Sequence, residues 1–389
     1  MSQKRITDCT SQRFDLSAMT QLSLMFLVVL AWAAVANSWA GTNTYFLQGM
    51  FEGKDQIDFI KELASIGVKV FRLSVRYQVL GCDKGTKVTW PVPALELALG
   101  EYKDETLDLL DQTLNLIRQH GNGMKVIISP HDGNSLYGCV KVMTGSNARI
   151  SSSDPYTHYG HSFYTSEEAE NYYDNRIRHI LDYRGKYTGE VWKDFHEMIL
   201  AFDVQNEPYA GLRQACGSEV GSDIAAADWV CRRASFMRNS LLGAGNPIKI
   251  ANGGLGGSDR NGCSFLEGAM QCPELDAVAR PGSAQLASDI EHWKSLANGK
   301  LLLVEALAIQ WRRSDLNVIS EFKKATDILN SAGIPWLSSS IIPDPTRSCA
   351  KSFESDADLT FIPVTLAKVD FKSAMESATN AEAWQDWGF

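Results

Sequence analysis

From residue 41 onward, short apolar runs alternate with longer amphipathic stretches, and this alternation constrains the fold more than any other feature of the chain. Short apolar runs bounded by turn residues predict strands. Eight such runs occur: Thr42–Leu47, Val68–Leu73, Lys125–Ser129, Ile199–Gln205, Ile248–Asn252, Leu275–Ala279, Leu301–Glu305 and Trp336–Ile342. Runs that are apolar throughout, such as KVIIS and LLLVE, are typical of strands covered on both faces, as in a parallel sheet.

The stretches between these strands have the apolar spacing of helices. The predicted helices are Asp55–Ile66, Glu105–His120, Glu167–Tyr183, Trp229–Leu242, Ala287–Ala297 and Leu316–Ala332. No helix is predicted between the fifth and sixth strands. After Pro345 the tail is polar and ends in AWQDWGF, and we expect it to form a last helix and a coil.

Repeated strand–helix units predict an α/β protein with one closed parallel barrel, the (β/α)8 or TIM barrel. A doubly wound open sheet is the alternative. No G-x-G-x-x-G follows any strand, so nothing in the sequence supports a dinucleotide site. The loops at 77–104, 130–166 and 208–227 are long and follow the second, third and fourth strands. In a barrel such loops build the functional face.

The N-terminal region carries a targeting signal. Residues 22–36 (LSLMFLVVLAWAAVA) form an apolar run that ends in an A-x-A pattern at Ala36, and Ser38-Trp39-Ala40 offers a second cleavage site. This length fits the apolar segment of a signal peptide better than a membrane span, which needs about 20 residues. We therefore predict a signal peptide at 1–36 and a mature barrel domain at 37–389, secreted and extracellular, that starts at Asn37 or Gly41.

Two points about the N-terminus stay open on the sequence alone. The apolar run can also act as an uncleaved signal anchor, and translation can begin at Met1 or Met19. If the signal is removed, we expect no attachment to a membrane.

The chain contains eight cysteines, which fits an oxidising destination. Cys9 lies in the predicted signal. The pairs Cys216/Cys231 and Cys263/Cys272 are close in loop-like sequence, and each is predicted to close a small loop; this leaves Cys82, Cys139 and Cys349, of which at least one has no partner within the chain. No C-x-x-C or Cys/His spacing indicates zinc, and we expect no metal or cofactor.

The net charge of −9 and the pI of about 5.4 give no basic surface for nucleic acid. Ten Trp, twelve Tyr and sixteen Phe supply enough rings for a core and for a sugar-binding groove. We expect a monomer whose partner is a polysaccharide or an oligosaccharide.

The chemistry is indicated by Asn206-Glu207-Pro208, which follows the fourth strand directly. A carboxylic acid at a strand's carboxyl end can protonate a glycosidic oxygen, and the neighbouring amide can bind a sugar hydroxyl. Glu305 ends the seventh strand and offers a second carboxylate. Two carboxyl groups about 5–5.5 Å apart are what a retaining glycosidase requires.

On these residues the chain resembles glycoside hydrolase family 5, in the clan of retaining β-glycosidases, and within it a fungal branch of endo-β-mannanases and endo-glucanases. The resemblance covers about residues 41–343. It rests on GTNTYFLQG at 41–49, FRL at 71–73, ISPHDGN at 128–134 and FDVQNEP at 202–208. It implies that Glu207 is the acid/base, that Arg72 steadies the nucleophile, and that His131 and Asn206 bind the sugar. Glu305 is our candidate nucleophile, and Trp336 is a candidate sugar-binding residue.

The chain departs from the family pattern in its last three strands. The family ends its seventh strand with Glu-aromatic-Gly, six residues after a Lys, and six residues after Lys300 comes Ala306 rather than Glu305. Because side chains alternate across a strand, this slip of one residue points Glu305 away from the site unless a bulge corrects it.

The sixth strand lacks the family's His-x-Tyr, and Ser339 takes the place of a Trp in the eighth, with Trp336 three residues early. Two hypotheses follow. The chain is either an active retaining glycosidase that cleaves mannan or β-glucan, or a carbohydrate-binding pseudoenzyme in which Ala306 replaces the nucleophile. On the second hypothesis hydrolysis is weak or absent and sugar binding is kept.

Overall fold

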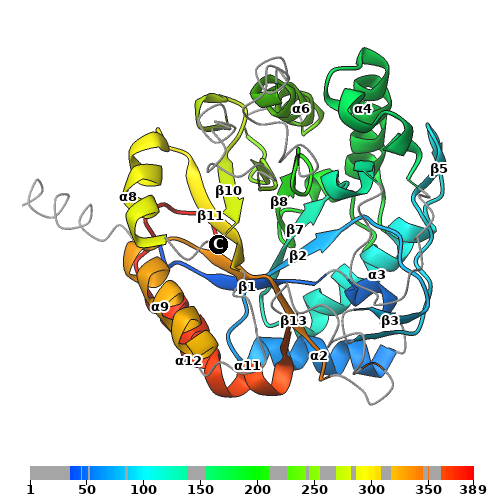
Figure 1. The fold of residues 1–389 in the computed structure, drawn as a ribbon. Coiled ribbons are helices and arrows are strands. Elements are labelled where there is room, and N and C mark those ends of the chain that lie inside the picture. The colour runs from blue at the N-terminus through cyan, green and yellow to red at the C-terminus, as the bar shows by residue number, and fades with distance from the viewer. Residues whose placement is uncertain are drawn as a thin grey trace, which may run out of the picture. The chain divides into compact units, whose positions relative to one another are not determined.

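Eight parallel strands close into a barrel in the order β1-β12-β11-β10-β9-β8-β7-β2 (Figure 1). The strands are β1 (Ala40–Asn43), β2 (Val70–Ser74), β7 (Lys125–Ser129), β8 (Ile199–Asp203), β9 (Lys249–Ala251), β10 (Ala277–Pro281), β11 (Leu301–Leu307) and β12 (Trp336–Ser338). Each predicted strand is present, and the TIM-barrel prediction is confirmed.

The computed structural model describes residues 36–44, 46–50, 53–83, 86–137, 154–209, 226–241, 245–254, 269–281, 286–307, 317–344, 349 and 361–389. The predicted signal segment and three of the cysteines, Cys139, Cys216 and Cys263, lie outside these ranges. Residues 36–389 belong to one compact unit. Within the described ranges, no helix is long and apolar enough to cross a bilayer.

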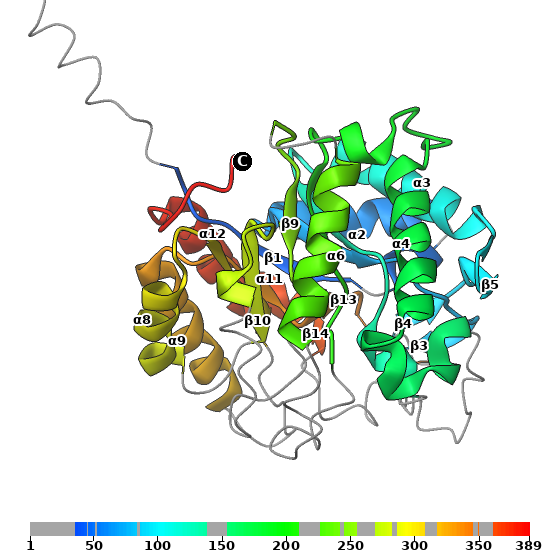
Figure 2. The same cartoon turned by 90° about the horizontal axis from the view of Figure 1, so that it is seen from above.

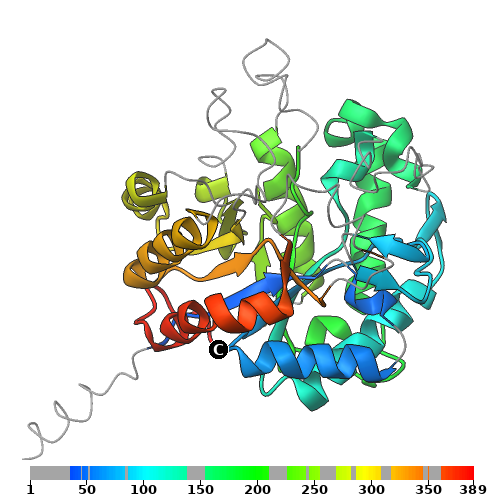
Figure 3. The same ribbon diagram turned by 60° about the horizontal axis from the view of Figure 1, so that its bottom comes forward.

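Helices cover the outside of the barrel, and each of the six predicted ones is found within three residues of its predicted ends. They are α2 (Gly53–Ser65), α3 (Glu105–His120), α4 (Glu167–Asp182), α6 (Ala226–Ser240), α8 (Leu286–Leu296) and α9 (Asn317–Ala332). Figure 2 shows α4 and α6 side by side. The tail forms β14 (Phe361–Pro363), α11 (Val364–Asp370) and α12 (Lys372–Asn380), and α12 packs against β1 and α9 (Figure 3).

Strand alternation divides the core into two apolar layers. Every second strand residue packs against the helices, in a cluster that also holds Phe59, Leu110 and Ile177. The other residues fill the barrel interior: Val70, Ile127, Ala201, Ala251, Ala277, Ala279, Leu301, Leu303 and Leu337. Trp39 and Trp387 belong to this inner cluster, with ring centroids 5.2 Å apart.

Shorter elements lie on the connections between the barrel strands and their helices. They are η1 (Leu47–Gly49), β3 (Gly81–Asp83) with β4 (Thr86–Val88), β5 (Glu96–Ala98) with β6 (Glu101–Tyr102), η2 (Gly133–Tyr137), η3 (Pro155–His158), η4 (Gly160–Tyr164), η5 (Trp192–Asp194) and β13 (Ser340–Ile342), which pairs with β14.

The disulfides differ from the predicted pairs. Cys231 on α6 bonds to Cys272, which lies five residues before β10, and Cys82 on β3 bonds to Cys349. The predicted pairs Cys216/Cys231 and Cys263/Cys272 are therefore wrong. Closeness in sequence misled the prediction because the barrel brings α6 beside the segment that leads into β10, across a separation of 41 residues.

Candidate active site

Strand β11 has a β-bulge at Glu305. Against β10, Arg280 pairs with Val304 but the next residue, Pro281, pairs with Ala306. Against β12 the register also shifts between Val304 and Leu307. Strand β11 thus holds one extra residue at this point, which is what defines a bulge.

Glu305 faces the barrel axis by the ordinary alternation of β11, and the bulge after Val304 lets Leu307 pack outward again. Val304 and Leu307 both lie in the outer cluster, whereas Leu301 and Leu303 lie in the inner one. The Glu305 side chain continues the inner row and is 1% exposed. Glu305 therefore points into the barrel despite the slip at Ala306, and the pseudoenzyme hypothesis loses the argument that Ala306 replaces the carboxylate.

Asn43, at the end of β1, supports the bulge through its side chain. Its amide nitrogen donates to the carbonyl oxygens of Glu305 (2.7 Å) and Ser338 (3.0 Å), and its amide oxygen accepts from Arg72 (3.3 Å). A bulge disturbs the ladder and leaves a backbone group to be satisfied from elsewhere. The Asn43 side chain satisfies the carbonyl oxygen of Glu305 at the bulge and also links β1 to β11.

Arg72 connects the residues of the site. From β2 its Nε donates to Asp203 (2.8 Å), its Nη1 to the Oδ1 atom of Asn206 (2.7 Å), and its Nη2 to the carbonyl of Gly253 (3.1 Å). Nη2 also lies 3.2 Å from Oε2 of Glu305. Arg72 is buried, so it holds its partners in a site from which water is largely excluded.

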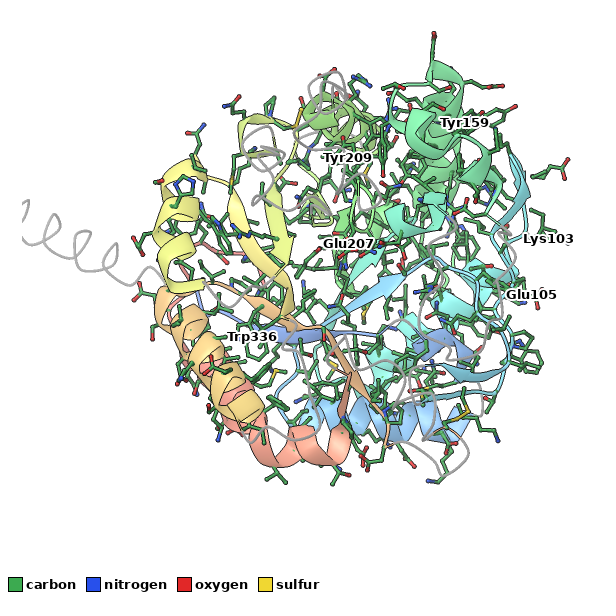
Figure 4. The ribbon with its side chains drawn as sticks, in the orientation of Figure 1. Lys103, Glu105, Tyr159, Glu207, Tyr209 and Trp336 are labelled. Atoms are coloured by element: carbon green, nitrogen blue, oxygen red, sulfur yellow. A yellow bond between two sulfur atoms is a disulfide. The ribbon has the colours of Figure 1, made fainter. Side chains whose placement is uncertain are left out.

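Glu207 follows β8 at the carboxyl end of the barrel, near the middle of the ring of strands in Figure 4. Its backbone is left-handed, with φ of 43°, and the same is true of Tyr209, with φ of 65°. Such angles in non-glycine residues cost about 1–3 kcal/mol and persist where surrounding contacts hold them. Here the Glu207 N–H donates to Gly253 (2.8 Å), and the Tyr209 N–H donates to the Tyr164 hydroxyl (2.8 Å).

Asn206 and Asn134 fix the polar groups on either side of Glu207. The Asn134 side chain donates to Oε2 of Glu207 (2.7 Å). The Asn206 side chain donates to Asp132 (2.8 Å), and its N–H donates to the His131 carbonyl (2.8 Å). Asp132 also accepts from Asn134 (3.0 Å), so the loop after β7 and the loop after β8 form one hydrogen-bonded unit.

The site gathers more negative charge than positive charge. Burial raises the pKa of Glu305 to about 8, against the attraction of Arg72, and the charges of Asp203 and Glu207 add to the increase. Burial also raises the pKa of Asp203, although Arg72 and Ser129 oppose that change. The Arg72 guanidinium is therefore shared by two buried carboxylates, Asp203 and Glu305, and the carboxylate of Glu207 lies near enough to act on Glu305.

His131 occupies a different place from the one expected. Its ring is 4% exposed and packs against Tyr156 and Tyr173, with centroids 5.5 and 5.7 Å away. Its two ring nitrogens lie 2.9 Å from the Gln205 amide and 2.8 Å from Asp154. A histidine held on both nitrogens is a support for the strand that carries Asn206 and Glu207. The prediction that it binds sugar is not supported by this position.

The position of Trp336 also corrects the prediction that this residue binds sugar. Figure 4 shows it between the barrel and α9, and its ring contacts Phe322 at 5.6 Å and donates to Asn330 (2.8 Å). It is fully buried in the outer cluster. Because β12 turns every second residue outward, Trp336 faces the helices and cannot form a sugar platform.

The sixth strand is as poor in polar groups as its sequence indicated. Its inward residues Ala277 and Ala279 are apolar. Arg280 points to the helices, where its guanidinium lies 4.1 Å from the Trp293 ring centroid. Among the described residues, β10 gives Glu305 no hydrogen-bond donor, and Oε2 of Glu305 has none from any other described residue.

Four contributors escaped the sequence analysis: Asp203, Asn43, Asn134 and the pair Gly253-Gly254. Asp203 lies two residues beyond the inward-facing Ala201 on β8, so alternation could have identified it. The Asn-Gly-Gly after β9 was a second available signal.

Gly254 is predicted to tolerate no side chain. Its φ is 76°, and a Cβ atom added there would lie 1.4 Å from Oε1 of Glu305. We expect Gly254→Ala to displace the Glu305 carboxylate and to lower turnover at least about tenfold, since a misplaced reacting group is costly. Gly123→Ala, at a similar φ of 77° with open space around it, is the matched control and should leave turnover unchanged. Equal rates for both variants would contradict the contact with Glu305.

Among the side chains that the structure describes, no group of three or more His, Cys, Asp or Glu could hold a metal ion.

The fold is a closed (β/α)8 barrel, with two carboxylates, Glu207 and Glu305, at the carboxyl ends of β8 and β11. Solved structures agree on the fold: endo-1,4-β-mannanase from Rhizomucor miehei (TM-score 0.61, 14% identity, 88% of this chain and 95% of that one) and endo-β-1,4-mannanase from Thermotoga petrophila (0.63, 15%, 91% and 79%). A family 5 mannosidase from Rhizomucor miehei is similar (0.58, 13%, 90% and 97%). No curated protein matches the sequence.

The family itself follows from the sequence match. The model of the "GH family 5 beta-mannosidase-like" domain matches residues 31–249, which is more than half of the 389 residues. The chain belongs to glycoside hydrolase family 5, as its motifs predicted.

Proposed function

We propose that this protein is a retaining β-glycosidase that hydrolyses a β-mannan-type polysaccharide. The observation that carries the proposal is that Glu305 continues the inward row of Leu301 and Leu303 on β11 and lies beside Arg72, which also holds Asn206. Glu207, next to Asn206, is the acid/base, and Glu305 is the nucleophile. Arg72 and Asn206 are the proposed sugar-binding and positioning groups.

The reaction takes two steps. Glu305 attacks the anomeric carbon while Glu207 protonates the departing glycosidic oxygen, so that the C–O bond breaks and a glycosyl ester forms on Glu305. Glu207, now ionised, removes a proton from water, and the water oxygen attacks the same carbon and releases Glu305. The asymmetry in proton state is essential: Glu305 must be ionised and Glu207 protonated at the start.

The substrate class is proposed from the relatives. The matching domain is named for β-mannosidases, and the similar structures cited above are mannanases and a mannosidase. β-1,4-Glucan is the alternative substrate.

The test is hydrolysis by the purified chain that starts at Asn37. Linear mannan, galactomannan and β-1,4-glucan are assayed for new reducing ends, and NMR records the anomer first released. We expect mannan to be cleaved fastest, with the β-anomer first, and Glu305→Ala to be inactive but folded. Faster cleavage of glucan would overturn the substrate class alone. Inversion, or no cleavage of any polymer, would overturn the activity.

We also propose secretion with a mature start at Asn37. The alternative start at Gly41 would remove Ser38, whose N–H donates to Ala381 (2.9 Å), and Trp39, which is 1% exposed in the barrel interior. Cleavage after Ala36 keeps both contacts. N-terminal sequencing of the secreted chain should read Asn-Ser-Trp; a chain that begins at Gly41, or one that keeps residues 19–36, would contradict this.

A further inference from the structure

Asp203 is a buried carboxylate that the proposed reaction does not use. It lies on β8, is 1% exposed, and points into the barrel beside Arg72. Its Oδ2 atom accepts two hydrogen bonds, one from Nε of Arg72 (2.8 Å) and one from the hydroxyl of Ser129 on β7.

Glu305 has the weaker hold on the same guanidinium. Its Oε2 lies 3.2 Å from Nη2 of Arg72, yet this atom has no hydrogen-bond partner among the described residues. Nη2 instead donates to the carbonyl of Gly253 (3.1 Å). Hydrogen bonds to a carboxylate favour its ionised form, so the two carboxyl groups differ in their affinity for a proton.

Among the residues that the structure describes, no second positive charge acts on Glu305. The charged groups that act on Glu305 are Arg72 on β2, Asp203 on β8 and Glu207 beyond β8. From β1, Asn43 donates to the backbone carbonyl of Glu305, and Gly254 after β9 lies against its carboxylate; both residues are uncharged. Two ionised carboxylates beside one guanidinium would leave a buried net charge of −1, which is costly.

We propose that Asp203 is a positioning residue that governs the protonation of Glu305 by taking the directed hydrogen bond of Arg72. The proton that neutralises the excess negative charge then resides on Glu305, whose Oε2 atom has no hydrogen-bond donor among the described residues. The inference rests on the proposed role of Glu305 as nucleophile. Its consequence is that Asp203 determines the pH above which the nucleophile becomes available.

Asp203→Asn tests this. Asparagine keeps the shape and an acceptor for Arg72 but removes the competing charge. We expect the acid limb of kcat/KM to move to lower pH by about one unit, so that the rate at a pH below the limb rises about tenfold relative to the plateau. The alkaline limb should stay in place.

A readout without turnover separates this inference from the proposed function. In the native chain at pH 7, infrared spectroscopy should detect a protonated carboxyl band that disappears in Glu305→Gln and falls by about half in Asp203→Asn, as a downward shift of about one unit from about 8 requires. Asp111→Asn is the control, because Asp111 is an equally buried carboxylate, on α3, that binds Thr188 rather than Arg72. It should keep the band.

Ser129→Ala provides a second variant that preserves every charge. Loss of one donor makes Asp203 a better proton acceptor, so the infrared band of Glu305 should weaken. The acid limb of kcat/KM should move to lower pH, by less than in Asp203→Asn. If the chain never hydrolyses a glycan but the band behaves as stated, the proposed function fails and the inference stands. A band and an acid limb that are unchanged in Asp203→Asn, or an acid limb displaced to higher pH, would overturn the inference.

Discussion

Glu207→Ala is expected to slow hydrolysis of the polysaccharide by about 10²–10⁴-fold, the usual contribution of a general acid. The loss should be much smaller for an aryl β-mannoside with a good leaving group, since such a group departs without a proton. The second step would still need the base, so an ester on Glu305 should accumulate and be detected as a burst. Initial rates on both substrates, with mass spectrometry of the intact chain, measure these effects.

Azide provides the complementary measurement for Glu207→Ala. A small anion can enter where the carboxylate has been removed and attack the ester directly, which yields a glycosyl azide of retained β-configuration. Glu168→Ala, on the exposed first turn of α4, is the control for loss of a surface carboxylate. An equal loss on both substrates would count against Glu207 as the acid, and an inverted azide product would count against the assignment of the two glutamates.

The fold could be predicted from the sequence because its signals are local. The strand Lys125–Ser129 and the helix Glu105–His120 have the same ends in the sequence prediction and in the structure. The helix has apolar residues at helical spacing, acidic residues in its first turn and basic residues in its last, which suits the helix dipole. The strand is a continuous apolar run. Both signals are contained in the segment itself.

The site could be predicted only in part, because its geometry depends on neighbours far apart in sequence. Glu207 was recognised because it follows a strand within one motif. The register of β11 around Glu305 depends on a bulge that β10 and β12 define, and on Asn43, which lies 262 residues away. Trp336 was misjudged for a related reason: only the register of β12 in the closed barrel decides which of its residues face inward.

Glu305→Gln is expected to make the protein more stable at pH 8 than the native chain, although it removes the proposed nucleophile. The pKa of Glu305 is about 8 in the folded chain, raised by burial from an ordinary value of 4.5. The unfolded chain therefore releases this proton at a lower pH than the folded chain does. Between these two values the folded state binds the extra proton, so the free energy of unfolding falls as pH rises.

The contribution of protonated Glu305 to the free energy of unfolding is fully present below about pH 4.5 and is lost as the pH passes through about 8. Because Glu305 is 1% exposed, solvent screens little of it, and the accumulated loss is on the order of a few kcal/mol. Glutamine resembles the protonated form and cannot ionise. The variant should match the native chain at pH 4.5 and exceed it increasingly toward pH 8, with the slope that Asp203 contributes still present.

Urea unfolding at a series of pH values measures this difference. The control is Glu62→Gln, which removes a carboxylate of α2 that is 40% exposed and paired with Lys368, and its stability curve should run parallel to the native one. If the native and Glu305→Gln curves are parallel as well, the carboxyl group is ionised in the folded chain at neutral pH. The excess negative charge beside Arg72 would then have to be neutralised by a group other than Glu305, and the free nucleophile would need no deprotonation before attack.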